Sequence, residues 1–225
     1  MNSTFESGTS VPGTRRHNWL SAGAIVTCLT TALFAIAVSA GLTGCSFLKP
    51  AEATARYFVL KPVPAAEPAP VASNTLAVGL GQVKLPAYLS STSLAISKGT
   101  NEIEYLPSAF WAERLDTGFQ RVLAVDLAAG LPNGQVRTSS WQKEDVAAEV
   151  YVTVEQFDVD VKGQGVLIAQ WRILSPGGEK VLKAGAARLS RPGPPPAAGP
   201  SGAVATLSDL VADLSRQLAQ ALPVH

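Results

Sequence analysis

Cysteine and histidine are scarce in this 225-residue chain, which has two of each. Cys28 lies inside an apolar run and Cys45 closes that run, so the rest of the chain has no cysteine pair for a disulfide and no thiol cluster for zinc. Beyond Cys45 the only histidine is His225, the last residue, so a Ser-His-Asp constellation has no internal base. We therefore expect no catalytic triad and no metal site.

An excess of charge of either sign is also absent. The chain has 18 basic and 17 acidic residues, and without residues 1–44 (which hold Glu6, Arg15 and Arg16) it keeps 16 of each. A nucleic-acid-binding domain usually carries a basic face, so nucleic acid is not an expected partner. The remaining body of about 175 residues is long enough to bury one core without disulfides.

What the chain does have is a run without charge, from Trp19 to Leu48. A polar start ending in Arg15-Arg16, an apolar run over residues 19–41 and small residues before a break are typical of a signal peptide. Leu42, Thr43, Gly44 and Cys45 then resemble a bacterial lipobox, in which the cysteine thiol receives a diacylglyceryl group and cleavage frees its amine for a further acyl chain. We expect residues 1–44 to be removed and Cys45 to carry covalent lipid, with no other cofactor.

The alternative for this segment is an uncleaved membrane span, for which residues 19–41 are long enough. Their many alanines, glycines and threonines weaken that interpretation. The pair Arg15-Arg16 leaves the export route open between the general secretory and twin-arginine pathways. The residue after the cysteine is Ser46 and not aspartate. In this the chain resembles lipoproteins that are sorted to the outer membrane, with the body facing the periplasm.

The chain after Cys45 divides at a proline- and alanine-rich connection over residues 61–73. Residues 45–74 are interpreted as a lipidated N-terminus with a short strand near Arg56–Leu60, and residues 75–222 as one α/β domain. Short apolar runs predict further strands at Thr75–Val83, Leu94–Ser97 and Glu102–Leu106, the last two forming a hairpin.

Helical spacing of Trp111, Leu115, Phe119 and Val122 predicts a helix over residues 109–128, with Ser108 as its N-cap. Alternation from Glu149 to Val161 slips by one at Glu155-Gln156, which predicts a long strand with a β-bulge.

Two more alternating runs, near residues 167–173 and 179–189, complete an antiparallel meander. A Pro/Gly-rich loop over 190–202 and an amphipathic helix over 203–222 follow. The expected fold is α+β, a largely antiparallel sheet with two helices packed on one face.

Four ordered segments resemble the PqiC-like family of auxiliary lipoproteins for ABC-type transporters. They are Tyr57-Phe58-Val59-Leu60; Val78-Gly79-Leu80 with Leu85-Pro86-Ala87-Tyr88-Leu89; Trp111-Ala112-Glu113-Arg114-Leu115 running on to Asp126-Leu127-Ala128; and Phe157-Asp158-Val159 with Leu167, Ala169 and Trp171. Together they span nearly all of residues 45–222. The chain departs from the family at Ser90-Ser91-Thr92, where an Asp-Arg-Pro-like stretch is usual.

The resemblance implies an outer-membrane lipoprotein that docks a periplasmic MCE-domain (mammalian cell entry) protein of an ABC transport system and serves intermembrane lipid transport. The ATPase would be another protein, because this chain lacks a Gly-rich phosphate loop. The alternatives are a lipoprotein that itself carries lipid and a generic envelope lipoprotein. A homo-oligomer is left open.

No residue pattern indicates an enzyme. The pairs Asp158/Asp160 and Asp209/Asp213 can in principle serve acid–base catalysis or bind calcium, but a solvated face explains them equally. Trp111, Phe119 and Trp171 are expected in the core, with a lipid groove as the alternative. Tyr88 and Trp141 fall outside the clear patterns and are candidate partner contacts, although Tyr88 can equally brace its turn.

Overall fold

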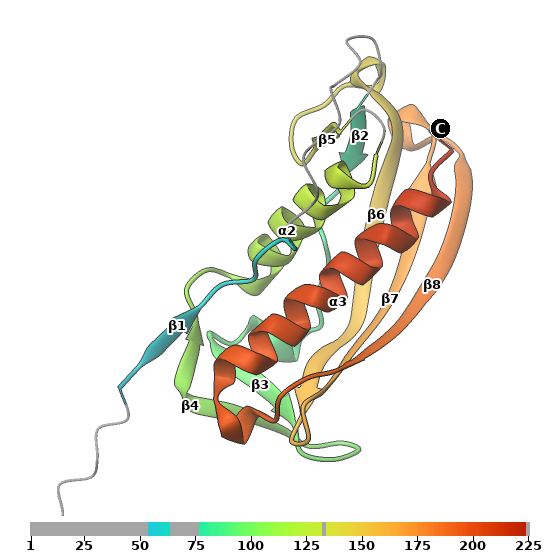
Figure 1. Cartoon of the computed structure of the whole chain (residues 1–225). Coiled ribbons are helices and arrows are strands. Elements are labelled where there is room, and N and C mark those ends of the chain that lie inside the picture. Colours follow the sequence, from blue (N-terminus) through green and yellow to red (C-terminus); the bar gives the residue numbers. More distant parts are fainter. Residues whose placement is uncertain (1–53, 64–76, 132–133, 224–225) are drawn as a thin grey trace, which may run out of the picture. The chain divides into compact units, whose positions relative to one another are not determined.

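The computed structural model describes residues 54–63, 77–131 and 134–223. Within these ranges the chain forms one eight-stranded sheet and two α-helices (Figure 1). The strands are β1 (Arg56–Phe58), β2 (Ala77–Leu80), β3 (Ser93–Ser97), β4 (Ile103–Trp111), β5 (Val136–Arg137), β6 (Val146–Asp160), β7 (Gln164–Leu174) and β8 (Val181–Pro192). The helices are α2 (Leu115–Ala129) and α3 (Pro200–Ala221). The α+β fold expected from the sequence is confirmed.

Strand β6 is the central strand of the sheet. One of its edges pairs with β7, which in turn pairs with β8, and these three strands form the expected antiparallel meander. Its other edge is shared: β2 pairs in parallel with its first half, and β3 pairs in parallel with its end. The sheet therefore branches, with β5 beyond β2 at one end and β4 and β1 beyond β3 at the other.

The slip in the alternation of β6 corresponds to a register shift. The pairing with β7 jumps between Val154 and Gln156, so the bulge is where the sequence predicts it. Because the bulge restores the phase of the alternation, Val150, Val152, Phe157 and Val159 are all buried in the same core.

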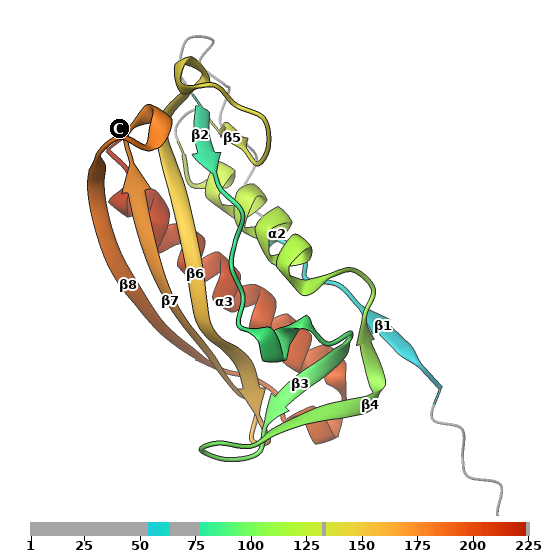
Figure 2. The same cartoon turned by 180° about the vertical axis from the view of Figure 1, so that it is seen from behind.

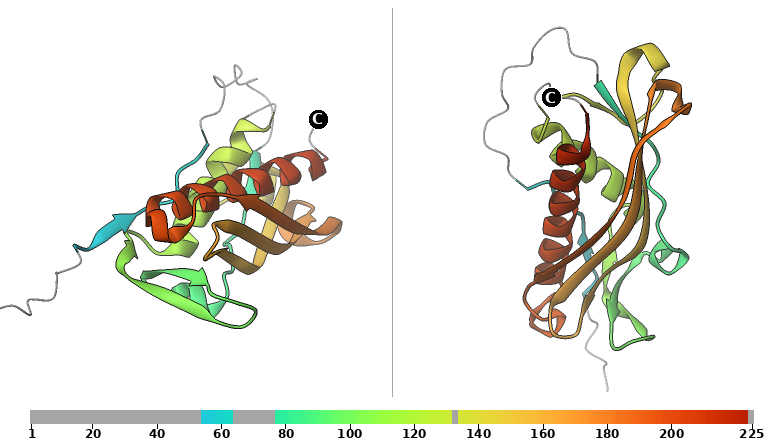
Figure 3. Two further views of the ribbon diagram at one scale, coloured as in Figure 1. Left: turned by 60° about the horizontal axis from the view of Figure 1, so that its bottom comes forward. Right: turned by 90° about the vertical axis from the view of Figure 1, so that its right-hand side faces the viewer.

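Both helices lie side by side on one face of the sheet, as the right-hand view of Figure 3 shows, and Figure 2 looks onto the opposite face. The space between the helices and the sheet is filled with side chains. Phe119 of α2 meets Phe157 of β6 edge to face, with ring centres 5.0 Å apart, and both are fully buried.

The predicted start of the first helix is wrong. Residues 109–111 continue β4, and α2 begins only at Leu115. The reason is tertiary: Ala109, Phe110 and Trp111 pair in parallel with β1, some fifty residues earlier in the chain. Pro107 is tolerated inside the strand because the pairing with β3 skips from Tyr105 to Phe110, so its missing N–H breaks no ladder bond to β3.

The predicted loop over 190–202 is also partly wrong. Strand β8 runs on to Pro192, because β7 offers partners as far as Gln164. A 3-10 turn over Pro196–Ala198 then leads into α3, which starts at Pro200 rather than at residue 203. Proline in the first turn of a helix costs no hydrogen bond, so the Pro-rich sequence starts the helix instead of delaying it.

Candidate functional site

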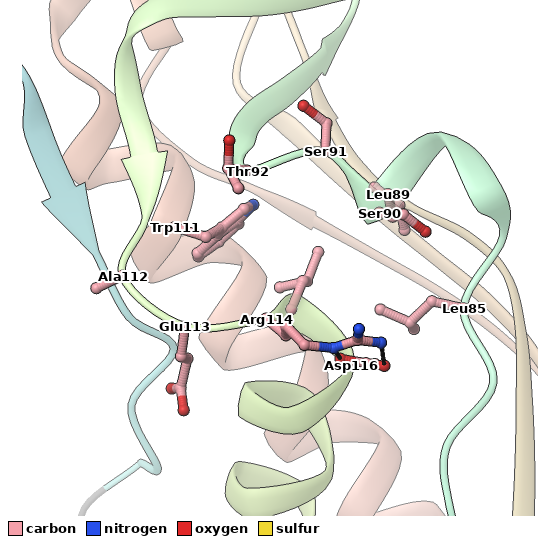
Figure 4. A pocket seen from close by; sticks show the side chains of 11 residues that line it. Leu85, Leu89, Ser90, Ser91, Thr92, Trp111, Ala112, Glu113, Arg114 and Asp116 are labelled. Atoms are coloured by element: carbon pink, nitrogen blue, oxygen red, sulfur yellow. Dashed lines mark hydrogen bonds and ion pairs between the residues drawn. The ribbon is translucent and has the colours of Figure 1, made fainter.

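A pocket of about 350 Å³ opens where the 3-10 turn η2 (Ala87–Ser90), the end of β4 and the start of α2 meet (Figure 4). Two of the segments that carry the family resemblance form its walls, Leu85–Leu89 on one side and Trp111–Leu115 on the other. Its apolar surface comes from Leu85, Leu89, Trp111, Ala112 and Leu115, and its rim from Ser90, Ser91, Thr92, Glu113, Arg114 and Asp116.

Backbone hydrogen bonds hold the two walls. The Trp111 N–H donates to the Thr92 carbonyl at 2.7 Å, which ties β4 to the segment after η2. The next amide, Ala112 N–H, donates to the Phe58 carbonyl at 2.8 Å, so the pocket wall is also joined to β1. Because main-chain bonds set both walls, the pocket is preformed.

Each charged side chain on the rim has a partner of opposite charge. Arg114 donates two hydrogen bonds to Asp116, at 2.6 and 3.1 Å, and this lowers the pKa of the Asp116 carboxyl. Glu113 accepts from Arg121 at 2.5 Å. With its charges neutralised, the pocket presents an apolar floor of a size that suits one or two apolar side chains rather than an ion.

Trp111 contributes a free donor to this pocket. Its side chain is only 7% exposed, and its indole N–H has no hydrogen-bond partner among the described residues. In Figure 4 the indole nitrogen lies on the edge of the ring that faces Thr92. An N–H held in this way can donate to a carbonyl oxygen of a bound peptide.

Tyr88 lies on η2 beside the pocket, but its hydroxyl points into the protein. It donates to Asp158 at 2.9 Å and accepts from the Phe157 N–H at 3.3 Å. Burial raises the pKa of the Tyr88 hydroxyl above its ordinary value. These bonds brace the turn that carries Leu89, and contact of Tyr88 with a partner stays a prediction.

Trp141 lies at the other end of the sheet, beside β2. Its ring covers Gly79, where a Cβ would come within 2.7 Å of the indole, and its N–H donates to Glu149 at 3.3 Å. Glu149 is buried and also accepts from the Tyr151 hydroxyl at 2.9 Å and the Gly177 N–H at 3.0 Å. We call Trp141, Glu149, Tyr151 and Gly177 the Glu149 junction. The structure therefore does not bring Trp141 and Tyr88 together.

The paired carboxylates are engaged in structural bonds. Asp158 accepts from Tyr88 and Gln156, and Asp160 accepts from two backbone amides of the β6–β7 turn. Asp209 and Asp213 both face Arg191 of β8. Among the described residues no three histidine, cysteine, aspartate or glutamate side chains gather as metal ligands.

Sequence reasoning missed the role of a strap, residues 58–63, which crosses both helices. Its Leu60 carbonyl accepts from Arg121 of α2 at 3.0 Å, and its Lys61 N–H donates to Ser208 of α3 at 3.2 Å. Its Val63 N–H donates to one oxygen of Asp126 on α2, at 3.1 Å.

Asp126 holds the strap to α2. The sequence offers a signal for this role, because Asp126 is the single charged residue on an otherwise apolar face of the helix. It is 8% exposed, and its second oxygen, Oδ2, has no partner among the described residues. Burial raises the pKa of Asp126 to about 6, against the lowering effect of the Val63 hydrogen bond.

Cys45 and the lipobox residues Leu42, Thr43 and Gly44 lie outside the described residues, so covalent lipid stays a prediction. The helices of the described part are too short or too polar to cross a membrane.

Solved structures share this fold at low sequence identity. An uncharacterised protein is 20% identical with a TM-score of 0.61, over 75% of this chain and 98% of that one. A Xanthomonas campestris protein of family DUF330 is 13% identical with a TM-score of 0.54, over 74% and 89%. PelC from Paraburkholderia phytofirmans, a dodecamer, has a TM-score of only 0.38 at 13% identity, over 66% and 90%, too distant to bear on this chain. Among curated proteins none matches.

A family model covers most of the chain. The model describes the ABC-type transport auxiliary lipoprotein component and matches residues 58–219, from the end of β1 to the last turn of α3. The match includes both walls of the pocket, the strap and Asp126. The chain belongs to the family of ABC-type transport auxiliary lipoprotein components.

Proposed function

We propose that this protein is anchored by lipid on Cys45 to the inner leaflet of the outer membrane and docks a periplasmic MCE-domain protein for intermembrane lipid transport. Family membership supports an association with an ABC transport system and with a membrane. The lipobox and Ser46 support the anchor and its destination. The PqiC-like segments support an MCE-domain protein as the partner.

The observation that carries the docking role is the meeting of two of those segments in one preformed pocket. An apolar floor with neutralised charges favours an apolar side chain of a partner, and the free Trp111 N–H favours a backbone carbonyl beside it. On the rim, Ser90, Ser91 and Thr92 add three hydroxyl groups, which can serve either as donors or as acceptors. This combination fits an extended peptide segment.

The lipid-carrier alternative receives no comparable support. The residues between the helices and the sheet pack against one another, as the contact of Phe119 with Phe157 illustrates. The pocket opens at the end of β4, and its lining residues Leu89, Trp111 and Leu115 belong to that packed core. We therefore retain docking as the single proposed function.

Site-specific photocrosslinking tests the docking role in the full chain. A photoreactive phenylalanine analogue at Arg114, whose side chain is 81% exposed on the pocket rim, is expected to capture the MCE-domain protein in cells that contain it. The matched control is Lys143, which is 65% exposed near the Glu149 junction and is expected to capture none. Equal capture from both positions, or none from Arg114, would refute docking at the pocket.

The anchor is tested separately. Replacing Cys45 by serine removes the nucleophile that takes the lipid, so acylation and signal cleavage are expected to be lost entirely. Intact mass measurement of protein isolated from cells reads this directly. Normal processing of Cys45→Ser would contradict the lipobox assignment.

A further inference from the structure

The edge strand β1 carries an aromatic cluster that is largely exposed, although its Phe58 packs partly against the core. Tyr57 is 69% exposed, the highest value among the large apolar and aromatic residues of the described chain. Its ring lies against Phe110 of β4, with centres 5.8 Å apart. On the other side of the strand the Arg56 guanidinium lies 5.2 Å from the centre of the Phe58 ring. We call Arg56, Tyr57, Phe58 and Phe110 the aromatic edge.

The aromatic edge has no covering element within the described chain. Among the strands of residues 54–63, 77–131 and 134–223, β1 is the last of its branch of the sheet and pairs only with β4. Figure 1 and the left-hand view of Figure 3 show it extending past the helices. Exposed edge strands with large apolar side chains are an aggregation hazard unless something occupies them.

The position of β1 along the chain indicates what occupies it. Arg56 follows the predicted lipid-bearing Cys45 by eleven residues. At about 3.5 Å per residue, even a fully extended connection spans only about 40 Å, and a flexible one averages about half that. If Cys45 is held in a bilayer, the residues of β1 lie within reach of its surface, because so few residues separate them from Cys45.

The chemistry of the cluster fits the same occupant. Tyrosine and other aromatic rings concentrate at the headgroup level of membranes, where an apolar ring and a polar tip are both satisfied. An arginine can place its charge among phosphates while its stem stays on apolar surface. A protein partner would be expected to bury a more continuous apolar surface than one exposed tyrosine and two half-buried phenylalanines.

We propose that the aromatic edge contacts the headgroup region of the phospholipid bilayer and orients the domain. This inference rests on the proposed lipid anchor at Cys45. With β1 at the bilayer, the strap and the pocket lie in the membrane-proximal part of the domain, since Ala112 of the pocket is bonded to Phe58. The Glu149 junction, at the opposite end of β6, then points away from the membrane.

Fluorescence of the full-length lipidated protein in vesicles tests this orientation. After signal cleavage Cys45 would be alkylated and Cys28 removed, so Tyr57→Cys supplies a single free thiol for an environment-sensitive dye. In vesicles of phosphatidylethanolamine and phosphatidylglycerol, the dye at position 57 is expected to shift to the blue. It should also be quenched by lipids that carry a shallow spin label. Val181→Cys, 53% exposed at the start of β8, is the matched control and should show neither effect.

Three outcomes would overturn the proposal. A sample that mass measurement shows to be acylated, yet with the dye at position 57 as unquenched as at position 181, rejects the bilayer contact and leaves the anchor standing. An unacylated sample rejects both. Energy transfer between labelled copies at position 57, without quenching by the spin-labelled lipid, assigns the edge to a second copy instead. Arg56→Cys, on the opposite side of the same exposed strand, provides a second label position should Tyr57→Cys fail to fold.

Discussion

The pocket and the Glu149 junction are built from similar parts, yet they differ in how completely those parts are satisfied. Each has a tryptophan at the margin of the sheet and acidic side chains nearby. At the junction, the indole N–H of Trp141, the Tyr151 hydroxyl and the Gly177 N–H all donate to one buried carboxylate. At the pocket, the indole N–H of Trp111 has no partner in the described chain, and apolar side chains surround an open volume.

The difference separates a structural joint from a candidate binding site. A buried carboxylate with three donors holds the β5–β6 loop, β6 and the β7–β8 turn together, and little binding capacity is left over. A preformed cavity with a free donor is the arrangement that a ligand completes. Substitutions confined to one region or the other therefore separate binding from stability.

Blocking the pocket is expected to have the largest effect on partner binding. Ser90→Trp places a bulky ring on the exposed lip of the pocket, so partner capture from position 114 should fall at least about tenfold, equivalent to about 1.4 kcal/mol. Thermal unfolding should change little, because Ser90 is exposed. Thr153→Trp, on the exposed face of β6, is the control and should capture normally. Normal capture by Ser90→Trp would contradict the site.

Dismantling the Glu149 junction is expected to act on stability instead. Glu149→Ala leaves three donors without an acceptor and should lower the free energy of unfolding by about 3 kcal/mol. Glu149→Gln keeps one acceptor oxygen and should cost about 1 kcal/mol. Denaturant unfolding measures both. A loss of partner capture in folded Glu149→Gln would show that this region contributes to binding as well.

Asp126 should make stability depend on pH in a direction that identifies it. Its pKa in the folded protein, about 6, lies above the ordinary value of 3.8, so the folded state binds the proton more tightly. The contribution of this group to the free energy of unfolding therefore falls as the pH rises from about 4 to about 6, by about 2 kcal/mol.

Asp126→Asn keeps an acceptor for the Val63 N–H but removes the buried charge. Relative to the native chain, it should be more stable by about 1–2 kcal/mol at pH 7 and nearly equal at pH 4. Denaturant unfolding of both proteins across this pH range gives the difference, in which the titration of all other groups cancels. A difference that does not vary with pH would refute the raised pKa.

The smallest effect is expected at the ion pair between β8 and α3. Arg191 donates to both oxygens of Asp213, at 2.9 and 3.1 Å, and its side chain is 37% exposed. Arg191→Lys loses the two-pronged geometry and should lower the free energy of unfolding by less than about 1 kcal/mol. The loss should shrink further in high salt, and partner capture should be unchanged.

The local sequence pattern was sufficient to predict strands wherever each strand pairs with the next one along the chain. The meander of β6, β7 and β8 and its bulge were predictable because consecutive strands joined by tight turns align their alternations. The start of α2 was not, since the helical spacing of Trp111 and Leu115 is produced by a strand end and a helix start that happen to be in phase. The pairing that decides between them comes from β1, far away in sequence.

The candidate site also has a part that the sequence predicts and a part that it does not. The segments Leu85–Leu89 and Trp111–Leu115 were recognisable one by one, but neither spacing nor composition shows that they face each other across a pocket. Tyr88 and Trp141 both fall outside the sequence patterns, but they lie at different ends of the sheet. Asp126 lies in a family-like segment, but its burial is not predictable from the sequence because a single acidic residue in a helix is normally solvent-exposed.

The amino-acid sequence by itself determined the class of the fold: one α+β domain behind a lipobox-like motif, with most of its strands, its bulge and its amphipathic last helix. These follow from local periodicity and from the chemistry of single residues. Only the tertiary structure decided where β4 ends, which segments line the pocket and which carboxylate is buried under the strap. Those features depend on contacts between residues far apart in the chain, whose free energies no local pattern records.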